Sequence, residues 1–252
     1  MARIPIGLQL YSVREECARD LPAVLDQVAE MGYEGVEFPA GGFGQEARPL
    51  RDMLDDRGLR CCGCHTPVES LQADRLEATV DFALQVGSLY LICPWLPEDW
   101  RDSLDAWARA ADFFNGVADD IRSYGLRVGY HNHSFEFQPI GGGPIPWVVL
   151  GEKTTCDVIL QLDTGNCMAG GGDPVAMLER FPGRSITVHL KEYSATEDAA
   201  VIGEGDVAWE KVFVLCEQVG NTEWFIVEQE TYPCPPLECA RRCLDALRAM
   251  GA

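Results

Sequence analysis

The sequence predicts an α/β fold in a single domain over residues 1–252, a (β/α)8 barrel of the TIM-barrel type. Short apolar runs typical of buried strands recur eight times, and most are followed by a longer stretch with the periodicity of an amphipathic helix. The length of 252 residues is close to the roughly 250 typical of such a barrel. No change of composition and no linker divides the chain, so one domain is expected.

The predicted strands and helices alternate from one end of the chain to the other. The strands cover residues 6–11, 35–38, 59–64, 89–93, 126–130, 158–162, 185–190 and 224–227. The helices cover residues 21–31, 50–57, 70–86, 100–124, 175–180 and 237–250, and several end at a glycine, as a left-handed cap requires. An open doubly wound sheet is the alternative, but no predicted strand leads into a Gly-x-Gly-x-x-Gly turn.

Two insertions follow predicted strands. Residues 141–146 come after the fifth strand, and residues 192–206 come after the seventh. Because the loops after barrel strands line the catalytic face of this fold, both are candidate lids.

The charge of the chain excludes one class of partner. Twenty basic and 40 acidic residues give a formal net charge of −20. Proteins bind nucleic acid largely by neutralising phosphates with Lys and Arg, so this surface would repel such a partner. We therefore expect no nucleic-acid ligand, and we interpret the acidity mainly as a source of solubility.

Cysteine usage and hydropathy predict a cytoplasmic protein. The eleven cysteines are an odd number spread over a long chain, and Cys61 and Cys64 form a CxxC motif without a second ligand pair for zinc. Reduced thiols are expected. The residues before the first predicted strand lack the pattern of a signal peptide, so none is expected, and the apolar runs are far shorter than the about 20 residues of a membrane span. No membrane partner is expected, and a homo-oligomer is compatible with the sequence.

All four histidines fall at or just past the carboxyl end of a predicted strand. His65 follows the third strand, His131 and His133 follow the fifth, and His189 lies in the last residues of the seventh. Functional residues of this fold come from those strand ends. One such histidine is more often structural than functional, but four of four indicate a site.

Carboxylates follow the same pattern. They are Glu37, Glu136, Asp163, Glu228 and Glu230. Buried carboxylates need a compensating charge, yet no Arg stands at a predicted strand end and Lys191 is the only Lys there. A divalent metal ion is the simplest compensator, and the alternative is a network of surface acids. Carboxylates with an imidazole suit Mn²⁺, Mg²⁺, Co²⁺ or Zn²⁺, and the oxygen-rich mixture slightly favours Mn²⁺.

Several short motifs occur in a characteristic order along the whole chain. They are GLQLYSVR at 7–14, GYEGVE at 32–37, YHNHSFEF at 130–137, LDTGN at 162–166, VHLK at 188–191, GEGDVAW at 203–209 and VEQE at 227–230. Together they resemble the sugar phosphate isomerase/epimerase family, which belongs to the xylose-isomerase-like TIM barrel superfamily. The match is specific at the level of the family and does not identify a member.

The resemblance implies one divalent metal ion with ligands from strands five to eight. Carried onto the matching positions, these ligands are Glu136, Asp163, His189 and Glu228. On strand five, His131 and His133 compete with Glu136, because residues two apart on an extended strand share a face. In relatives with this pattern, the second histidine resembles a catalytic base and the glutamate a ligand.

The chemistry that the resemblance implies is proton transfer next to a carbonyl, through a metal-stabilised enediolate. His133 or Glu136 is the expected base on one side, and Glu228 the acid/base on the other. The sequence thus predicts a metal-dependent isomerase or epimerase of a small keto-sugar or polyol. A metal-dependent lyase or dehydratase acting on a keto-inositol or 3-keto-glycoside is the alternative. In ketose 3-epimerases strand five typically ends in Glu-Pro, whereas this chain has YHNH at 130–133, and this difference argues against simple ketose epimerisation. A non-catalytic sugar-binding protein is a third reading.

Further residues are expected to contact the substrate. They are His65, Trp95, His131, Lys191 and Glu230. Trp95 can stack on the apolar face of a sugar, and Lys191 can hold a hydroxyl group or polarise a carbonyl. A packed rim aromatic and a solvated lysine are the competing interpretations. A substrate phosphate is not expected, because the chain lacks a glycine-rich cradle and has few basic residues at strand ends.

Overall fold

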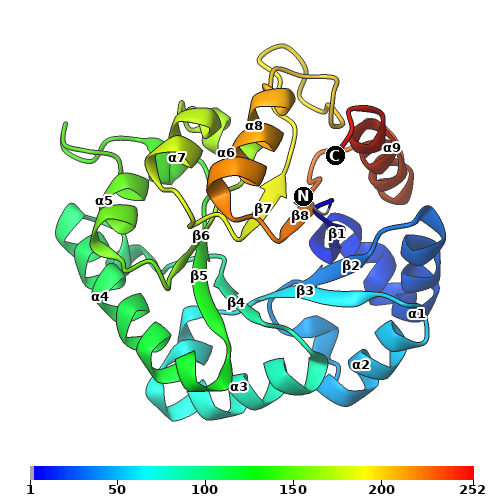
Figure 1. The fold of residues 1–252 in the computed structure, drawn as a ribbon, viewed down its shortest axis with the longest axis horizontal. Coiled ribbons are helices and arrows are strands. Elements are labelled where there is room, and N and C mark those ends of the chain that lie inside the picture. The colour runs from blue at the N-terminus through cyan, green and yellow to red at the C-terminus, as the bar shows by residue number, and fades with distance from the viewer. Residues whose placement is uncertain (1–2) are drawn as a thin grey trace.

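Parallel strands form the centre of the molecule, and helices surround them (Figure 1). The computed structural model describes residues 3–252, and over these residues the sheet has eight strands. The predicted (β/α)8 barrel is therefore confirmed. The strands are β1 (Ile6–Gln9), β2 (Gly35–Phe38), β3 (Arg60–His65), β4 (Tyr90–Cys93), β5 (Arg127–His131), β6 (Ile159–Gln161), β7 (Thr187–Leu190) and β8 (Trp224–Val227).

The α-helices form the outer layer of the barrel. They are α1 (Arg14–Met31), α2 (Ala47–Asp55), α3 (Ala73–Val86), α4 (Leu104–Ile121), α5 (Pro146–Lys153), α6 (Thr164–Ala169), α7 (Pro174–Arg180), α8 (Trp209–Leu215) and α9 (Pro236–Ala249). Sequence periodicity missed α5, α6 and α8. They have 8, 6 and 7 residues, too few for an apolar stripe to recur clearly.

Helix α1 begins seven residues earlier than the sequence predicts. Asp20 has non-helical angles (φ −157°, ψ 84°), so the helix is kinked there, just before Pro22. The Asp20 carboxylate accepts a hydrogen bond from the Ala23 N–H at 3.0 Å, as an N-cap does. The predicted helix therefore corresponds to the segment after the kink.

The barrel closes between its shortest strand, β6, and β7. The hydrogen-bonded order runs β6-β5-β4-β3-β2-β1-β8-β7, and an isolated parallel bridge joins Asp163 to His189 across the remaining gap. The His189 N–H donates to the Leu162 carbonyl at 2.9 Å in this seam. Closure of the barrel thus brings two of the expected metal ligands together.

Two apolar clusters show which parts of the barrel are filled by apolar side chains. The larger core joins the outer side of the strands to the helices, and it includes Leu91 of β4 and Phe114 of α4. A smaller cluster consists of Cys62, Tyr90, Ile92, Ile159, Ile186, Trp224 and Ile226. Because Tyr90 and Ile92 alternate with Leu91 on β4, the smaller cluster fills the inside of the barrel. The buried residues Gln9, Glu37, His131 and His189 lie toward the carboxyl ends of their strands.

The loop between β7 and α8, one of the two candidate lids, is organised by a buried carboxylate. Glu192 accepts hydrogen bonds from the Gly203 N–H at 2.7 Å and from the Trp209 Nε1–H at 2.8 Å. The loop therefore folds back on itself and lies beside α8 in Figure 1. A lid role for this loop and for residues 141–146 stays a prediction.

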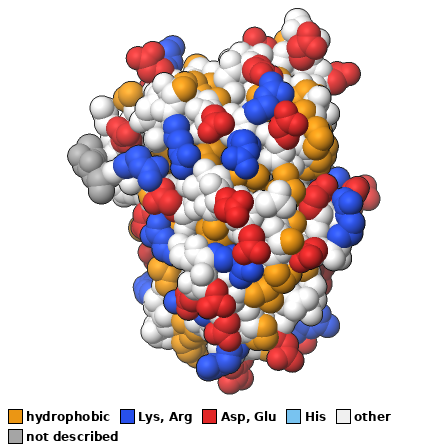
Figure 2. Space-filling view, turned by 90° about the vertical axis from the view of Figure 1, so that its right-hand side faces the viewer, with side chains coloured by type: hydrophobic (Ala, Val, Ile, Leu, Met, Phe, Trp, Pro, Cys, Tyr) orange, Lys and Arg blue, Asp and Glu red, His pale blue; other side chains and the backbone are white. Residues whose placement is uncertain are grey.

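The surface carries charges of both signs. Figure 2 shows acidic and basic side chains interspersed on the face that it presents. Within residues 3–252, no helix is long and apolar enough to cross a membrane.

Candidate metal centre

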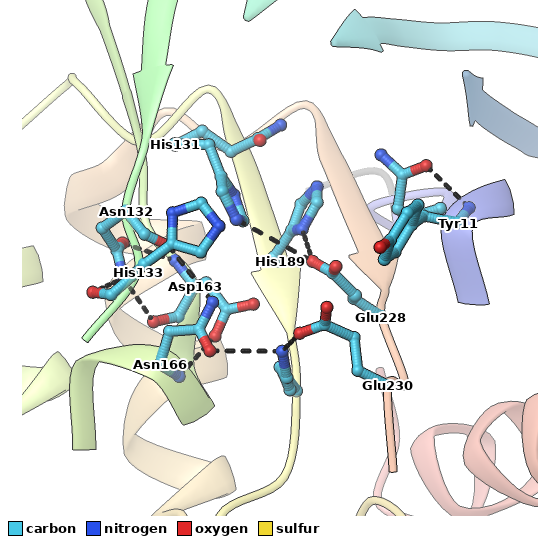
Figure 3. Close-up of polar contacts among 12 residues, drawn as sticks. Tyr11, His131, Asn132, His133, Asp163, Asn166, His189, Glu228 and Glu230 are labelled. Atoms are coloured by element: carbon cyan, nitrogen blue, oxygen red, sulfur yellow. Dashed lines mark hydrogen bonds and ion pairs between the residues drawn. The ribbon is translucent and has the colours of Figure 1, made fainter. Parts of the chain in front are cut away.

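Four buried side chains meet at the carboxyl ends of the strands (Figure 3). They are His131 at the end of β5, Asp163 just after β6, His189 on β7 and Glu228 just after β8. Each offers one donor atom, and these atoms all lie within 4.8 Å of one another. Two carboxylates with two imidazoles are a donor set suited to a divalent transition metal. Three of the four ligands that the resemblance implies lie in this cluster.

The Asp163 carboxylate has one oxygen engaged and one free. Oδ1 caps α6 by accepting from the Asn166 N–H at 2.6 Å. Oδ2 is buried and has no hydrogen-bond partner among the described residues. Burial raises the pKa of Asp163 to about 7, although the charge of Lys191 opposes the rise. An unpaired buried oxygen is costly, so the site fits a cation placed against Oδ2.

His189 lies between two carboxylates. Its Nδ1 is 2.5 Å from Glu228 Oε2, and its Nε2 is 2.6 Å from Glu37 Oε2. Burial alone lowers the pKa of His189, but the charges of Glu37 and Glu228 raise it to about 10. A metal ion at Nδ1 would therefore displace a proton, while Nε2–H continues to donate to Glu37.

Glu37 is the centre of a buried polar network directly behind His189. Its carboxylate accepts from Gln9 Nε2 at 2.7 Å and from Gln161 Nε2 at 3.0 Å, and His65 Nε2 lies 3.2 Å away. Burial favours the neutral acid, but the charges of His65 and His189 bring the pKa of Glu37 well below its usual range. A Cβ at Gly63 would lie 2.3 Å from Glu37 Oε1, so a glycine is needed there.

Sequence reasoning placed Glu37 at a strand end and at the barrel mouth, and left substrate contact and structural hydrogen bonding as equal alternatives for it. The available signal was an ionisable residue inside GVEF, a strand whose four residues are all buried. What the sequence could not reveal is its partner, because His189 is 152 residues away along the chain.

Glu136 lies outside the cluster of four. It sits in a short 3-10 helix, Phe135–Phe137, where Oε1 accepts from the Tyr130 hydroxyl at 2.6 Å and Oε2 from the His133 N–H at 2.8 Å. Burial raises the pKa of Glu136 to about 7, against the effect of the Tyr130 hydrogen bond. Both carboxylate oxygens of Glu136 thus accept hydrogen bonds that stabilise the turn after β5. The residue from strand five that belongs to the cluster is His131.

The other strand-five histidine and Trp95 lie at the edge of the site. His133 Nδ1 is buried without a hydrogen-bond partner in the described part of the chain, and burial lowers the pKa of this ring to about 4. Trp95 packs edge-on against it, with ring centroids 4.9 Å apart, and leaves 47% of its surface exposed. The Arg101 guanidinium covers Trp95 at 4.6 Å from the ring centroid. An exposed, well-packed aromatic ring therefore stands beside a neutral imidazole.

Lys191 and Glu230 form an ion pair next to the cluster (Figure 3). Lys191 Nζ also donates to Asn166 Oδ1 at 3.2 Å. Burial lowers the pKa of Lys191, but the charges of Asp163, Glu228 and Glu230 outweigh it and raise the pKa above its usual value. The lysine is therefore a fixed cation at the site and not a solvated loop residue.

His65 lies against the ring of His189. The two rings are stacked, with centroids 5.4 Å apart and an interplanar angle of 12°. His65, His131 and His189 also bring ring nitrogens within 4.8 Å of one another. Every histidine of the chain is therefore part of this site or in contact with it.

Comparison with known proteins gives matches along the chain. The family described as Xylose isomerase-like TIM barrel matches residues 25–250. The inosose dehydratase of Serratia proteamaculans is 24% identical over 253 residues, covering 83% of this chain and 82% of that protein. A solved sugar phosphate isomerase/epimerase from Parabacteroides distasonis is 26% identical, with a TM-score of 0.84 and 99% of both chains covered. The IOLI protein with a binding zinc atom shares the fold at 12% identity, with a TM-score of 0.76 over 98% of this chain and 97% of that one.

Proposed function

Because the chain belongs to the xylose isomerase-like TIM barrel family, as its motifs predict, we propose that it is a metal-dependent lyase. Its substrate would be a small cyclic keto-polyol, such as a keto-inositol, from which it removes water. The choice of a lyase over an isomerase rests on the position of Glu136. Both of its carboxylate oxygens accept hydrogen bonds within the turn after β5, so Glu136 does not form a catalytic carboxylate pair with Glu228. A neutral histidine and a cationic lysine flank the cluster instead. The inosose dehydratases among its relatives support the same reaction.

The ligands of the metal would be His131, Asp163, His189 and Glu228. The unpartnered Asp163 Oδ2 and His131 Nδ1 support this set within the described residues. With two imidazoles the donors suit Zn²⁺ as well as Mn²⁺, and a zinc atom is bound in the IOLI protein. When bound, such an ion supplies a Lewis acid that stabilises negative charge on a carbonyl oxygen.

The proton transfers are assigned to His133 and Lys191. His133 is a neutral imidazole with a free ring nitrogen, so it can accept the proton from the carbon next to the carbonyl. Lys191 is held by Glu230 and Asn166 and can protonate the departing hydroxyl group. The C–H bond breaks at one carbon and the C–O bond at its neighbour, and water leaves. Trp95 and His65 would contact the substrate ring.

Isomerisation or epimerisation of a keto-sugar is the second candidate. It is favoured by Glu228, which can return a proton from the side opposite His133, and by the solved isomerase/epimerase at 26% identity. The two reactions begin with the same proton abstraction. They differ in whether a hydroxyl group leaves.

The deciding experiment follows solvent deuterium. Purified protein is stripped with a chelator, reloaded with Zn²⁺ or Mn²⁺, and incubated in D₂O with keto-inositols and ketoses, with products read by NMR and mass spectrometry. Loss of water that depends on the metal supports the lyase. Deuterium incorporation without loss of water supports the isomerase. Tight sugar binding without metal and without exchange would refute both.

Substitutions on strand five test the ligand assignment. We expect His131→Ala to weaken metal binding by roughly 100-fold or more, because loss of a partner that only orients a ligand already costs 10–100-fold. Glu136→Gln should keep the metal but lower the free energy of unfolding by about 1–3 kcal/mol, because one hydrogen bond of the buried turn is lost. Metal content after dialysis and urea unfolding measure the two effects. Metal loss in Glu136→Gln with retention in His131→Ala would reverse the assignment.

A further inference from the structure

Two cysteine thiols touch each other beside the active-site end of the barrel. Cys234 lies in the segment between β8 and α9, and Cys239 lies near the start of α9. Their sulfur atoms are 3.1 Å apart, and Cys239 Sγ also lies 3.2 Å from the Cys234 carbonyl oxygen. The backbone thus already holds the two sulfurs side by side.

The pair differs from the other cysteines of residues 3–252 in combining thiol contact with access to solvent. Cys234 is half-buried. Cys61 and Cys64 also approach each other, at 3.7 Å, but both are buried. Cys156 is exposed and serves below as a comparison.

A fixed positive charge stands beside the accessible thiol. Arg242 Nη1 lies 3.5 Å from Cys234 Sγ, and another nitrogen of the same guanidinium pairs with Glu204 in the loop between β7 and α8. The Cys239 thiol is buried, and burial raises its pKa to about 11. Cys234 has the more accessible sulfur, so it is the attacking thiol, and Cys239 follows.

We propose that Cys234 and Cys239 form a reversible disulfide by exchange with glutathione disulfide. The Cys234 thiolate attacks one sulfur of glutathione disulfide, forms a mixed disulfide and releases one glutathione. The Cys239 sulfur then attacks Cys234 Sγ, and its proton goes to the second departing glutathione. The protein loses two electrons, which the small disulfide gains.

The bond would join the segment that carries the active-site acids to the last helix. This segment begins at Glu228, contains Glu230, and is also held by the Tyr232 hydroxyl, which donates to the Ser12 carbonyl at 2.9 Å. Because the sulfurs are already in contact, closure requires only a small shift. The modification site is independent of which reaction the metal centre performs.

The test uses the metal-loaded protein equilibrated in glutathione buffers of increasing oxidation. Free thiols are then alkylated and each cysteine is assigned by peptide mass mapping. We expect Cys234 and Cys239 to lose alkylation together, in a peptide lighter by two hydrogens, and excess reduced glutathione to reverse the change. Cys239→Ser should trap glutathione on Cys234, and Cys156→Ser should leave the pairing unchanged.

Several outcomes would overturn the proposal. They are a stable glutathione adduct on Cys234 of the unaltered protein, oxidation of Cys61 and Cys64 before the pair, and full alkylation of both thiols in the most oxidising buffer. The decisive measurement needs no substitution, so poor folding of a variant does not obscure it. Circular dichroism of Cys239→Ser checks that its fold is retained before its adduct is interpreted.

Discussion

Asp163→Asn is expected to abolish metal binding while leaving the fold intact. Asparagine caps a helix about as well as aspartate, so the hydrogen bond to the Asn166 N–H at the start of α6 is kept. The negative charge of the unpartnered Oδ2 is lost. Because Lewis-acid stabilisation of a transition state is worth several kcal/mol, activity should fall by about three orders of magnitude or more.

Thermal unfolding with and without metal measures this prediction. A ligand at 100 times its dissociation constant stabilises the folded state by about 2.7 kcal/mol, so metal should stabilise the unaltered protein but not the variant. Asp173→Asn is the matched control. Asp173 caps α7 by accepting from the Val175 N–H at 2.9 Å and is not part of the metal cluster. An equal stabilisation of Asp163→Asn by metal would show that the ion binds elsewhere.

Glu37→Gln is expected to weaken metal binding without removing a ligand. Glu37 accepts hydrogen bonds from Gln9 and Gln161 and lies 2.6 Å from His189 Nε2. A glutamine has one acceptor oxygen in place of two. Its amide N–H groups would face the N–H groups that now donate to the carboxylate. The ring of His189 then loses its fixed orientation, and such a loss costs roughly 10–100-fold in metal affinity.

Calorimetric titration of the stripped protein with Zn²⁺ gives the affinity directly, and histidine NMR reports which nitrogen of His189 carries a proton. Glu34→Gln is the comparison, because Glu34 pairs with Arg3 at the surface and lies away from the metal cluster. If Glu37→Gln bound metal as tightly as Glu34→Gln, then Glu37 would not position the ligand.

The elements that the sequence predicts well are those whose signal is local. Strand β2 and strand β8 agree with their predicted bounds, because an apolar run identifies a buried strand without reference to the rest of the chain. Helix α6 was missed because its six residues carry no apolar stripe, and it begins at a capping aspartate that the sequence also presents as a metal ligand.

In the candidate site, the sequence points to Asp163, His189 and Glu228 because each stands where a strand ends, and the structure brings these three side chains together. The sequence leaves the strand-five residue open. In the structure, the Tyr130 hydroxyl and the His133 N–H hold Glu136 away from the cluster. Whether a side chain in a turn faces the site depends on such contacts, and periodicity along a strand does not describe them.

The sequence by itself thus determined the barrel, its order of strands and the edge at which its ionisable residues gather, because these follow from local hydropathy and from the rules of parallel sheets. The tertiary structure decided which of those residues meet. Closure of the barrel between β6 and β7 places Asp163 beside His189, and Glu37 reaches His189 from across the barrel. These contacts join residues far apart in the chain, so they exist only once all eight strands of the described residues have assembled.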